Sequence, residues 1–326
     1  MSNHGHKKVQ DFSDLNDDRY LGGKKSEKKK LELIDQIRVD KENGVPKTFA
    51  HIAKKALNFT DMADKFTGIE ALGVLKVDVD NLGLIFACGL KRISLSRLAT
   101  LSRQMNNYFT IYLPYILTET EIFRDIYTVF AGGDDLFLIG PWNKIIELAL
   151  FINNSFKGYT CENSQITLSS GISIHKPGEP VLSIGERAEG VLKKSKGNDR
   201  DSITLFDEPV KWKDFAALGD IKTVINTWMD KKIINNAMLF RLNTFSHMAK
   251  VEKELLKLKE GIEMEDWECI KWRANFKYTI ARNVGRNLKS EEKSNAIKEV
   301  EKAAGWIVEY GGGMKIPIWQ IIYDRR

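Results

Sequence analysis

The segment from Ile126 to Gly140, IYTVFAGGDDLFLIG, constrains the fold of this chain more than any other. Two runs of β-branched, aromatic and other apolar residues flank a Gly-Gly-Asp-Asp sequence, which predicts two strands joined by a tight turn. The glycines, Gly132 and Gly133, permit the backbone angles that a short turn needs. The acidic residues, Asp134 and Asp135, then lie at the tip of a stiff scaffold and repel each other unless a cation neutralises them. An ordinary solvated turn is the alternative, since Gly-Asp is common in turns.

A second acidic segment, residues 73–86 (GVLKVDVDNLGLIF), favours a bound cation over an ordinary solvated turn. It predicts a short buried strand that Asp78 and Asp80 interrupt near its end, and a carboxylate there is costly unless it is paired or bound to metal. If this strand neighbours the hairpin in one sheet, four carboxylates converge. Such a cluster suits Mg²⁺ when phosphates complete its coordination. Asp80 has two possible roles: it supports the metal ligands, or it caps the helix that follows.

The overall composition is that of a globular protein. Hydrophobic residues make up 43% of the chain, charged residues 29%, and the net charge is +6, which permits a nucleic-acid partner without requiring one. The three cysteines, Cys88, Cys161 and Cys269, are far apart, so neither a zinc site nor a disulfide framework is expected. No apolar run reaches transmembrane length and the N-terminus does not resemble a signal peptide, so we expect a cytoplasmic protein without membrane contact.

The chain is expected to have three parts. Residues 1–44 are polar and rich in charge, including KKSEKKK, which predicts a partly disordered segment with a helix over 28–39. Residues 45–208 predict an α+β domain, a ferredoxin-like palm with an antiparallel sheet and helices on one face. Residues 209–326 predict a mostly helical domain, whose aromatic residues we expect in a core or interface. A basic run near Lys277 contacts an RNA backbone or a protein, or is a solvated helix face.

Within the palm, the order of elements is strand, helices, hairpin, helix, strand, helix, strand. We expect strands at 73–79, 166–175 and 203–206 besides the hairpin. We expect helices at 82–88, from a cap at Ser94 or Ser96 to about 114 or somewhat beyond, at 145–156 and at 181–196.

Three segments in order, DVDNLG, SLSRLATLSR and AGGDDLFLIGPW, resemble the large polymerase-cyclase subunit of type III CRISPR effector complexes, especially its Csm-type members. More distantly they are similar to GGDEF-type diguanylate cyclases. The resemblance runs from about Val45 to Phe206. It implies a palm domain that joins ATP molecules into cyclic oligoadenylate when target RNA is bound. It also implies two Mg²⁺ or Mn²⁺ ions, a guide RNA and other subunits of the ribonucleoprotein as partners.

The resemblance also implies roles for individual residues. Asp78, the backbone carbonyl of Val79 and Asp134 become metal ligands, and Asp135 a ligand or its support. Lys196 at the end of a helix binds triphosphate, with the neighbouring Lys193 and Lys194 as alternatives or, without function, as residues that stabilise the helix dipole. The remaining nucleotide-binding candidates lie in the turn and the Ser-rich helix: Gly132, Gly133, Ser96 and Ser102. The two serines are candidates for the adenine edge because guanine-reading residues have no clear counterparts, although a helix cap and a helix surface explain them equally well.

The sequence also departs from the full-length family. It contains no His-Asp dipeptide and no paired cysteines, so it looks like the second palm and the C-terminal helical domain only, and cleavage of single-stranded DNA is not expected. Since the family's ATP site lies between two palms, this chain is expected to supply half of it and to need a second palm chain or copy. A non-catalytic structural palm and a stand-alone nucleotide cyclase are the alternative functions.

Overall fold

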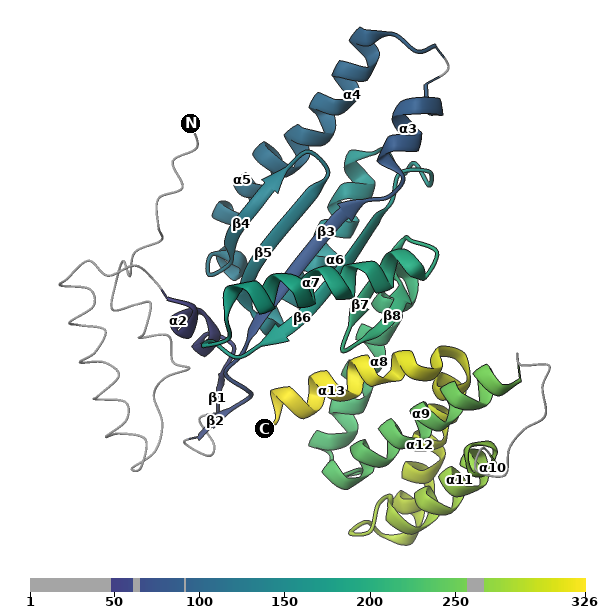
Figure 1. Cartoon of the computed structure of the whole chain (residues 1–326). Helices are drawn as coiled ribbons and strands as arrows, with labels where there is room; N and C mark the ends of the chain where they lie inside the picture. The colour runs from purple at the N-terminus through teal and green to yellow at the C-terminus, as the bar shows by residue number, and fades with distance from the viewer. Residues whose placement is uncertain (1–47, 61–64, 91, 257–266) are drawn as a thin grey trace, which may run out of the picture. The chain divides into compact units, whose positions relative to one another are not determined.

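The structure, a computed structural model, describes residues 48–60, 65–90, 92–256 and 267–326 (Figure 1). The chain divides into two compact units, one of residues 1–204 with 323–326 and one of residues 205–322. The polar segment 1–44, with its expected helix, lies outside the described residues. No helix in the described part is long and apolar enough to cross a membrane.

The central sheet has six strands in the order β4-β5-β3-β6-β7-β8. The strands are β3 (Leu72–Val79), β4 (Tyr127–Gly132), β5 (Asp135–Pro141), β6 (Leu168–His175), β7 (Ser202–Leu205) and β8 (Glu208–Lys211). β3 is antiparallel to both β5 and β6, and β4 is antiparallel to β5. With the helices between them, β3, β4, β5 and β6 have the strand order of a ferredoxin-like palm, which confirms the predicted fold class. The strand β8 was not predicted.

Helices cover both faces of this sheet, so the expectation of helices on one face is wrong. A Cβ on Gly73 would lie 2.8 Å from the Cβ of Ile145 in α6 (Trp142–Tyr159), whereas a Cβ on Gly171 would lie 2.6 Å from the backbone nitrogen of Leu192 in α7 (Val181–Gly197). Figure 1 shows α7 in front of the sheet and α6 behind it. The reason is that β3 is apolar on both faces and therefore needs cover on both.

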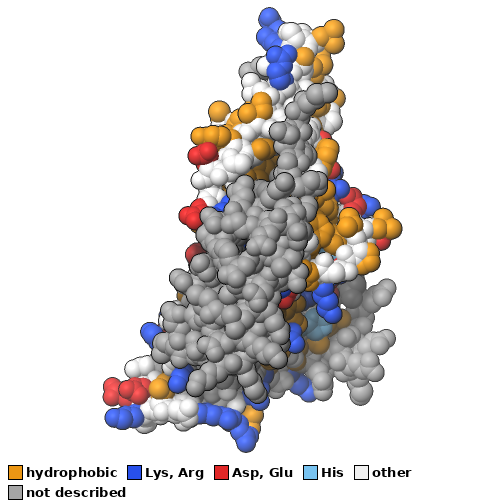
Figure 2. All heavy atoms as spheres, turned by 90° about the vertical axis from the view of Figure 1, so that its left-hand side faces the viewer, with side chains coloured by type: hydrophobic (Ala, Val, Ile, Leu, Met, Phe, Trp, Pro, Cys, Tyr) orange, Lys and Arg blue, Asp and Glu red, His pale blue; other side chains and the backbone are white. Residues whose placement is uncertain are grey.

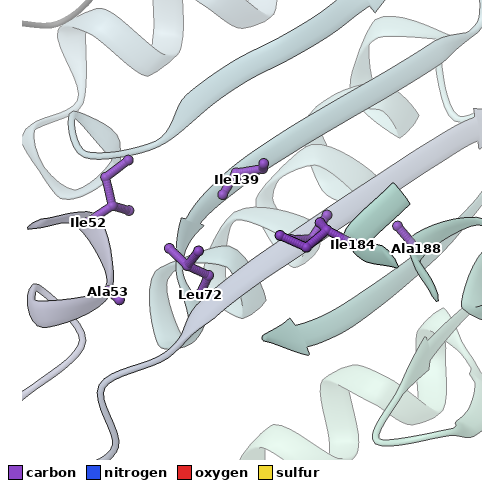
Figure 3. Packing of buried hydrophobic residues seen from close by; sticks show 7 residues of the cluster. Ile52, Ala53, Leu72, Ile139, Ile184 and Ala188 are labelled. Carbon is purple, nitrogen blue, oxygen red and sulfur yellow. The ribbon is translucent and has the colours of Figure 1, made fainter. Parts of the chain in front are cut away.

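The core on the α7 face joins strands, α7 and the N-terminal helix α2 (Phe49–Lys54) (Figure 3). Its buried members are Ile52, Ala53, Leu72, Val74, Ile139, Ile184 and Ala188. In α7 the buried residues recur at helical spacing, so one stripe packs on the sheet and the flanking positions carry charge. A separate two-stranded sheet, β1 (Asn58–Thr60) with β2 (Lys65–Thr67), follows α2.

A long helical segment connects β3 to β4. The short helix α3 (Leu82–Cys88) ends before Gly89 as predicted, and Ser94, not Ser96, caps α4 (Leu95–Asn107) with its hydroxyl. The helix continues through a π-helical turn, η3 (Tyr108–Tyr112), into α5 (Leu113–Glu119) and the short η4 (Glu121–Phe123). The helix runs past Pro114 to Glu119, as the predicted range allowed, and Pro114 lies just after the π-helical turn.

The second unit is helical, as the sequence predicted. Its helices are α8 (Trp212–Asp230), α9 (Asn236–Leu255), α10 (Trp267–Ile270), α11 (Trp272–Asn283), α12 (Ser290–Tyr310), η6 (Gly311–Met314) and α13 (Lys315–Asp324). The end of α13, from Tyr323 on, belongs to the first unit. Trp228 and Trp306 stack with ring centroids 5.4 Å apart, and Trp272 and Phe276 are buried. Trp228, Trp272 and Phe276 therefore belong to the core, whereas Trp306 is half-buried and Tyr278 is 63% exposed.

Candidate active site

The Gly-Gly-Asp-Asp turn is the two-residue loop between β4 and β5. Gly132 pairs with Asp135, which leaves Gly133 and Asp134 as the turn. Of the two glycines only Gly133 has a positive φ, +64°, as the first position of a type II′ turn requires. The side-chain oxygen of Asn106 at the end of α4 accepts a hydrogen bond of 3.0 Å from the Gly133 amide and so fixes the turn.

The two acidic segments meet as the sequence predicted, because β3 and β5 are neighbours. Asp78 lies directly opposite Asp135 in the antiparallel register. One residue further, the amide of Val79 donates to the carbonyl of Asp134 at 3.1 Å. Side chains alternate between the faces of a strand, so Asp78 lies on the same face as Lys76, which is the face that α7 covers.

Helix α7 brings two further charges to this face. Lys196 Nζ, near the end of the helix, lies 2.7 Å from Asp78 Oδ2. Two turns earlier, Glu189 Oε2 lies 2.5 Å from Lys76 Nζ, which is 3.7 Å from Asp135 Oδ2. The close approach at Gly171, which is opposite Lys76 in β6, lets α7 come this near to the strands. The site therefore has two carboxylates opposite each other, Asp78 and Asp135, each beside a lysine.

Partial burial makes both carboxylates costly to ionise. Burial raises the pKa of Asp78 above its ordinary value, although Lys196 works in the opposite direction. Burial likewise raises the pKa of Asp135, against the effect of Lys76. Among the described residues, the buried Oδ1 of Asp135 has no hydrogen-bond partner. A bound cation would stabilise the ionised form of both carboxylates and would give Asp135 Oδ1 a partner.

Asp80 has a structural role and does not cap a helix. It is 1% exposed and accepts hydrogen bonds from the hydroxyls of Thr167 at 2.8 Å and Ser169 at 2.6 Å, and from the amide of Asp201 at 3.0 Å. The following helix begins after Asn81, which makes no side-chain cap. Asp80 therefore ties the end of β3 to β6 and to the loop after α7.

A divalent cation fits this donor set only with help from another group. Among the described residues, no three acidic, His or Cys side chains gather into a preformed metal site. Asp78 and Asp135 offer carboxylate oxygens, one of them buried and unpaired, and Mg²⁺ commonly binds through one or two carboxylates plus substrate phosphates. The residues thus fit a cation that arrives with a nucleotide.

The two serines lie at different distances from the turn. Both are exposed on α4, whose residue Asn106 contacts Gly133. Ser102 is one helical turn from Asn106, about 6 Å along the axis, whereas Ser96 is about 15 Å away. Only Ser102 therefore lies beside the turn.

Sequence reasoning missed three residues at the site: Lys76, Glu189 and Asn106. Lys76 could have been noticed as a charge two residues before Asp78 in an otherwise apolar strand, and Glu189 as the residue seven before Lys196 on one helix face. Asn106 gave no signal, because its role depends on where α4 ends relative to the hairpin.

Comparisons with known proteins agree with this geometry. Residues 71–204 match the family model described as Cas10/Cmr2, second palm domain. Among curated relatives, the Cas10/Csm1 single-strand-specific deoxyribonuclease (subtype III-A) of Methanocaldococcus jannaschii is 36% identical over 184 residues, 49% of this chain and 23% of that protein. The counterpart from Enterococcus italicus is 29% identical over 235 residues, 70% of this chain and 28% of that protein. The chain therefore spans about a quarter of the length of these relatives.

Solved structures show the same fold. A Csm1–Csm4 cassette in complex with pppApA covers 87% of this chain and 38% of its own, with a TM-score of 0.60 and 22% identity. Csm1 of T. onnurineus covers 87% of this chain and 40% of its own, with a TM-score of 0.57 and 23% identity. The family match, the relatives and the ferredoxin-like sheet agree: residues 71–204 are similar to the second palm domain of the Cas10/Cmr2 family.

Proposed function

We propose that this chain is the palm part of a type III CRISPR effector large subunit and joins ATP into cyclic oligoadenylate in response to target RNA. One observation carries the proposal: Asp78 lies opposite Asp135 on neighbouring strands, with the Lys196 ammonium 2.7 Å from Asp78. Carboxylates beside a lysine, at the tip of a Gly-rich turn, are suited to hold a cation and a triphosphate together.

The similar solved structures support the substrate class. Csm1–Csm4 cassettes are known in complex with ATP, with pppApA and with cA4. ATP is a monomer, pppApA joins two adenylates, and cA4 is a cyclic product, so these ligands follow one reaction series. The same series is the expected chemistry of this chain.

In this proposal Mg²⁺ or Mn²⁺ is held by Asp78, Asp134, Asp135 and the carbonyl of Val79, as a pair of ions. When bound, such ions lower the pKa of the attacking 3′-hydroxyl and neutralise the departing pyrophosphate. Lys196 binds the triphosphate, and the Gly132–Gly133 backbone lets phosphates approach the turn. No side chain is assigned as general base.

The reaction is an in-line attack of the 3′-hydroxyl of one ATP on the α-phosphate of another, with pyrophosphate leaving. Lys196 neutralises charge on the β- and γ-phosphates and orients them. Ser102, beside the turn, is the better of the two serine candidates for the adenine edge, and Ser96 is the weaker one.

The chain supplies half of a composite site and needs a second palm chain or copy. An exposed apolar surface on the first unit supports a partner: Leu84, Ile93, Leu95, Ile111, Tyr115, Val129 and Phe130. Figure 2 shows hydrophobic and basic side chains at the upper end of the molecule, where Figure 1 places α3 and α4. Exposed apolar patches mark interaction sites. Other subunits of the complex, a guide RNA and target RNA complete the partners.

A structural palm without catalysis is the second candidate. The observation that favours it is that Lys196 and Lys76 already pair with Asp78 and Asp135. Carboxylates neutralised by lysines stabilise the sheet without any cation.

The test is to incubate the chain with radiolabelled ATP and Mg²⁺ or Mn²⁺, with and without partner chains and target RNA. Cyclic adenylates that depend on RNA and disappear in the double variant Asp134→Ala/Asp135→Ala support the enzyme. Absence of product with every partner combination contradicts it and leaves the structural palm.

A further inference from the structure

Lys76 is a charged residue in the middle of β3, between the apolar residues Leu75 and Val77. Its side chain is 20% exposed and lies two residues before Asp78 on the same face of β3. Burial of an ammonium lowers its pKa, but the hydrogen bond to Glu189 and the charge of Asp135 outweigh burial, so the pKa of Lys76 is raised. The same contact with Lys76 lowers the pKa of Glu189. Glu189 Oε2 lies 2.5 Å from Lys76 Nζ, so the two side chains form an ion pair.

The two oxygens of Asp135 have different surroundings. Oδ2 lies 3.7 Å from Lys76 Nζ. Oδ1 is buried and has no hydrogen-bond partner among the residues that the structure describes. A half-turn of the carboxylate restores the same arrangement, because its oxygens are equivalent, but any smaller rotation moves the unpaired oxygen. The charge of Lys76 attracts the other oxygen and opposes such a rotation, so the ammonium holds the orientation of the carboxylate.

We propose that Lys76, held by Glu189, is a positioning residue that engages Asp135 Oδ2 and thereby fixes Oδ1 as the oxygen presented to a divalent cation. The inference rests on the proposed function, since it takes Asp135 as a cation ligand. Lys76 itself touches no substrate and acts through Asp135. Glu189 acts one step further back, through Lys76.

Positioning can be separated from charge by comparing two cations. Removal of the Lys76 charge strengthens the attraction for every divalent cation by a similar factor, because the Coulomb energy depends on ionic charge. A loosened ligand affects cations differently, since Mg²⁺ demands near-octahedral geometry whereas Ca²⁺ tolerates irregular coordination. The ratio of Mg²⁺ to Ca²⁺ affinity therefore reports ligand position and cancels the effect of charge.

The experiment measures Mn²⁺ binding to the full chain, with a non-hydrolysable ATP analogue present, by electron paramagnetic resonance, followed by competition with Mg²⁺ and with Ca²⁺. Lys76→Met and Glu189→Gln are expected to lower the Mg²⁺/Ca²⁺ affinity ratio about tenfold, as loss of residues that orient ligands does. Lys76→Arg retains the charge and the hydrogen bond to Glu189, so its ratio is expected close to that of the unmodified chain. The control is Lys144→Met, which removes the Lys144–Glu147 pair on α6.

An unchanged ratio in Lys76→Met and Glu189→Gln, with melting temperatures near that of the unmodified chain, overturns the inference. A fall of the Mg²⁺/Ca²⁺ affinity ratio in Lys144→Met as large as that in Lys76→Met also overturns the inference. Asp135→Asn separates this failure from failure of the proposed function. If the unmodified chain binds no Mn²⁺ beside the analogue, both proposals fall. If Asp135→Asn binds Mn²⁺ as well as the unmodified chain does, Asp135 is not a ligand and the positioning role alone falls. If Asp135→Asn loses Mn²⁺ while the Lys76→Met ratio is unchanged, only the positioning role falls.

Discussion

The ammonium of Lys196, near the end of α7, lies 2.7 Å from Asp78 Oδ2 at the end of β3. This contact joins the last turn of a helix to the strand end that carries the proposed cation ligand. A single lysine thus neutralises Asp78 in the structure and, in the proposed function, contacts the triphosphate. The contact makes Lys196, rather than its neighbours, the residue to test first.

Lys196→Met is expected to weaken binding of a non-hydrolysable ATP analogue with Mg²⁺ by about tenfold or more, since hydrogen bonds to charged groups contribute about 1.5–3 kcal/mol. The side chain of Lys193 is 73% exposed, so Lys193→Met is expected to weaken binding of the analogue by about threefold or less. Isothermal titration calorimetry measures both. A larger loss of affinity in Lys193→Met than in Lys196→Met would show that Lys193, and not Lys196, binds the triphosphate.

Asp80→Ala is expected to lower the free energy of unfolding by about 2–4 kcal/mol, because it leaves three donors without their buried acceptor. Asp220→Ala, an exposed residue on α8, is the control and is expected to change stability by about 0.5 kcal/mol or less. Urea denaturation followed by circular dichroism provides the comparison. Equal effects of the two substitutions would show that the Asp80 hydrogen bonds do not hold β3 to β6.

Two glycines near α7 are expected to respond to alanine with opposite signs. At Gly171 a Cβ would lie 2.6 Å from the Leu192 backbone, so Gly171→Ala forces α7 off the sheet and costs about 3 kcal/mol or more. At Gly190, inside α7, a Cβ meets no described atom within 4 Å, so Gly190→Ala stabilises the helix by about 0.5–1 kcal/mol. Melting temperatures that move in the same direction would contradict this packing.

His175 is expected to make stability depend on pH. Its side chain is fully buried, with Nδ1 2.9 Å from Glu179 Oε2 and Nε2 2.7 Å from the hydroxyl of Ser173. Burial lowers the pKa of His175 below its usual 6.5, although Glu179 opposes this, while Arg187 beside Glu179 adds to the lowering. The folded state therefore takes up the proton less readily than the unfolded state, and the free energy of unfolding decreases as the pH falls below 6.5.

The measurement is the free energy of unfolding at about pH 7.5 and about pH 5.5 in the unmodified chain and in His175→Asn. The decrease is expected to be smaller in the variant, even though the variant is less stable at both pH values. His247→Asn, at an exposed position on α9, serves as control and retains the full decrease. An unchanged decrease in His175→Asn would show that other groups cause it.

Local sequence patterns predicted most of the palm. The apolar runs around Gly133 predicted the hairpin, which depends on neighbouring residues only. The approach of Asp78 to the hairpin acids was predicted only on the condition that the two strands are neighbours, which β3 and β5 are. The helix 82–88 was predicted with its observed bounds, because Gly89 ends it. The fold class followed from the order of these elements.

Features that depend on long-range contacts could not be read from the sequence. Helix cover on both sheet faces depends on Gly73 and Gly171, whose partners are distant in sequence. The sequence left Asp80 with two possible roles, support of the metal ligands or a helix cap, and only the structure placed Thr167, Ser169 and Asp201 around it. Lys76 and Glu189 are 113 residues apart, so no local pattern connects them.

The most direct test of the central claim is a crystal structure of the chain with Mn²⁺ and a non-hydrolysable ATP analogue, using the anomalous signal of manganese. The account predicts a manganese peak at Asp78 and Asp135 Oδ1, with the triphosphate beside it and Lys196 turned from Asp78 toward the phosphates. A nucleotide bound elsewhere, or no manganese peak with the Lys196–Asp78 pair intact, would contradict it.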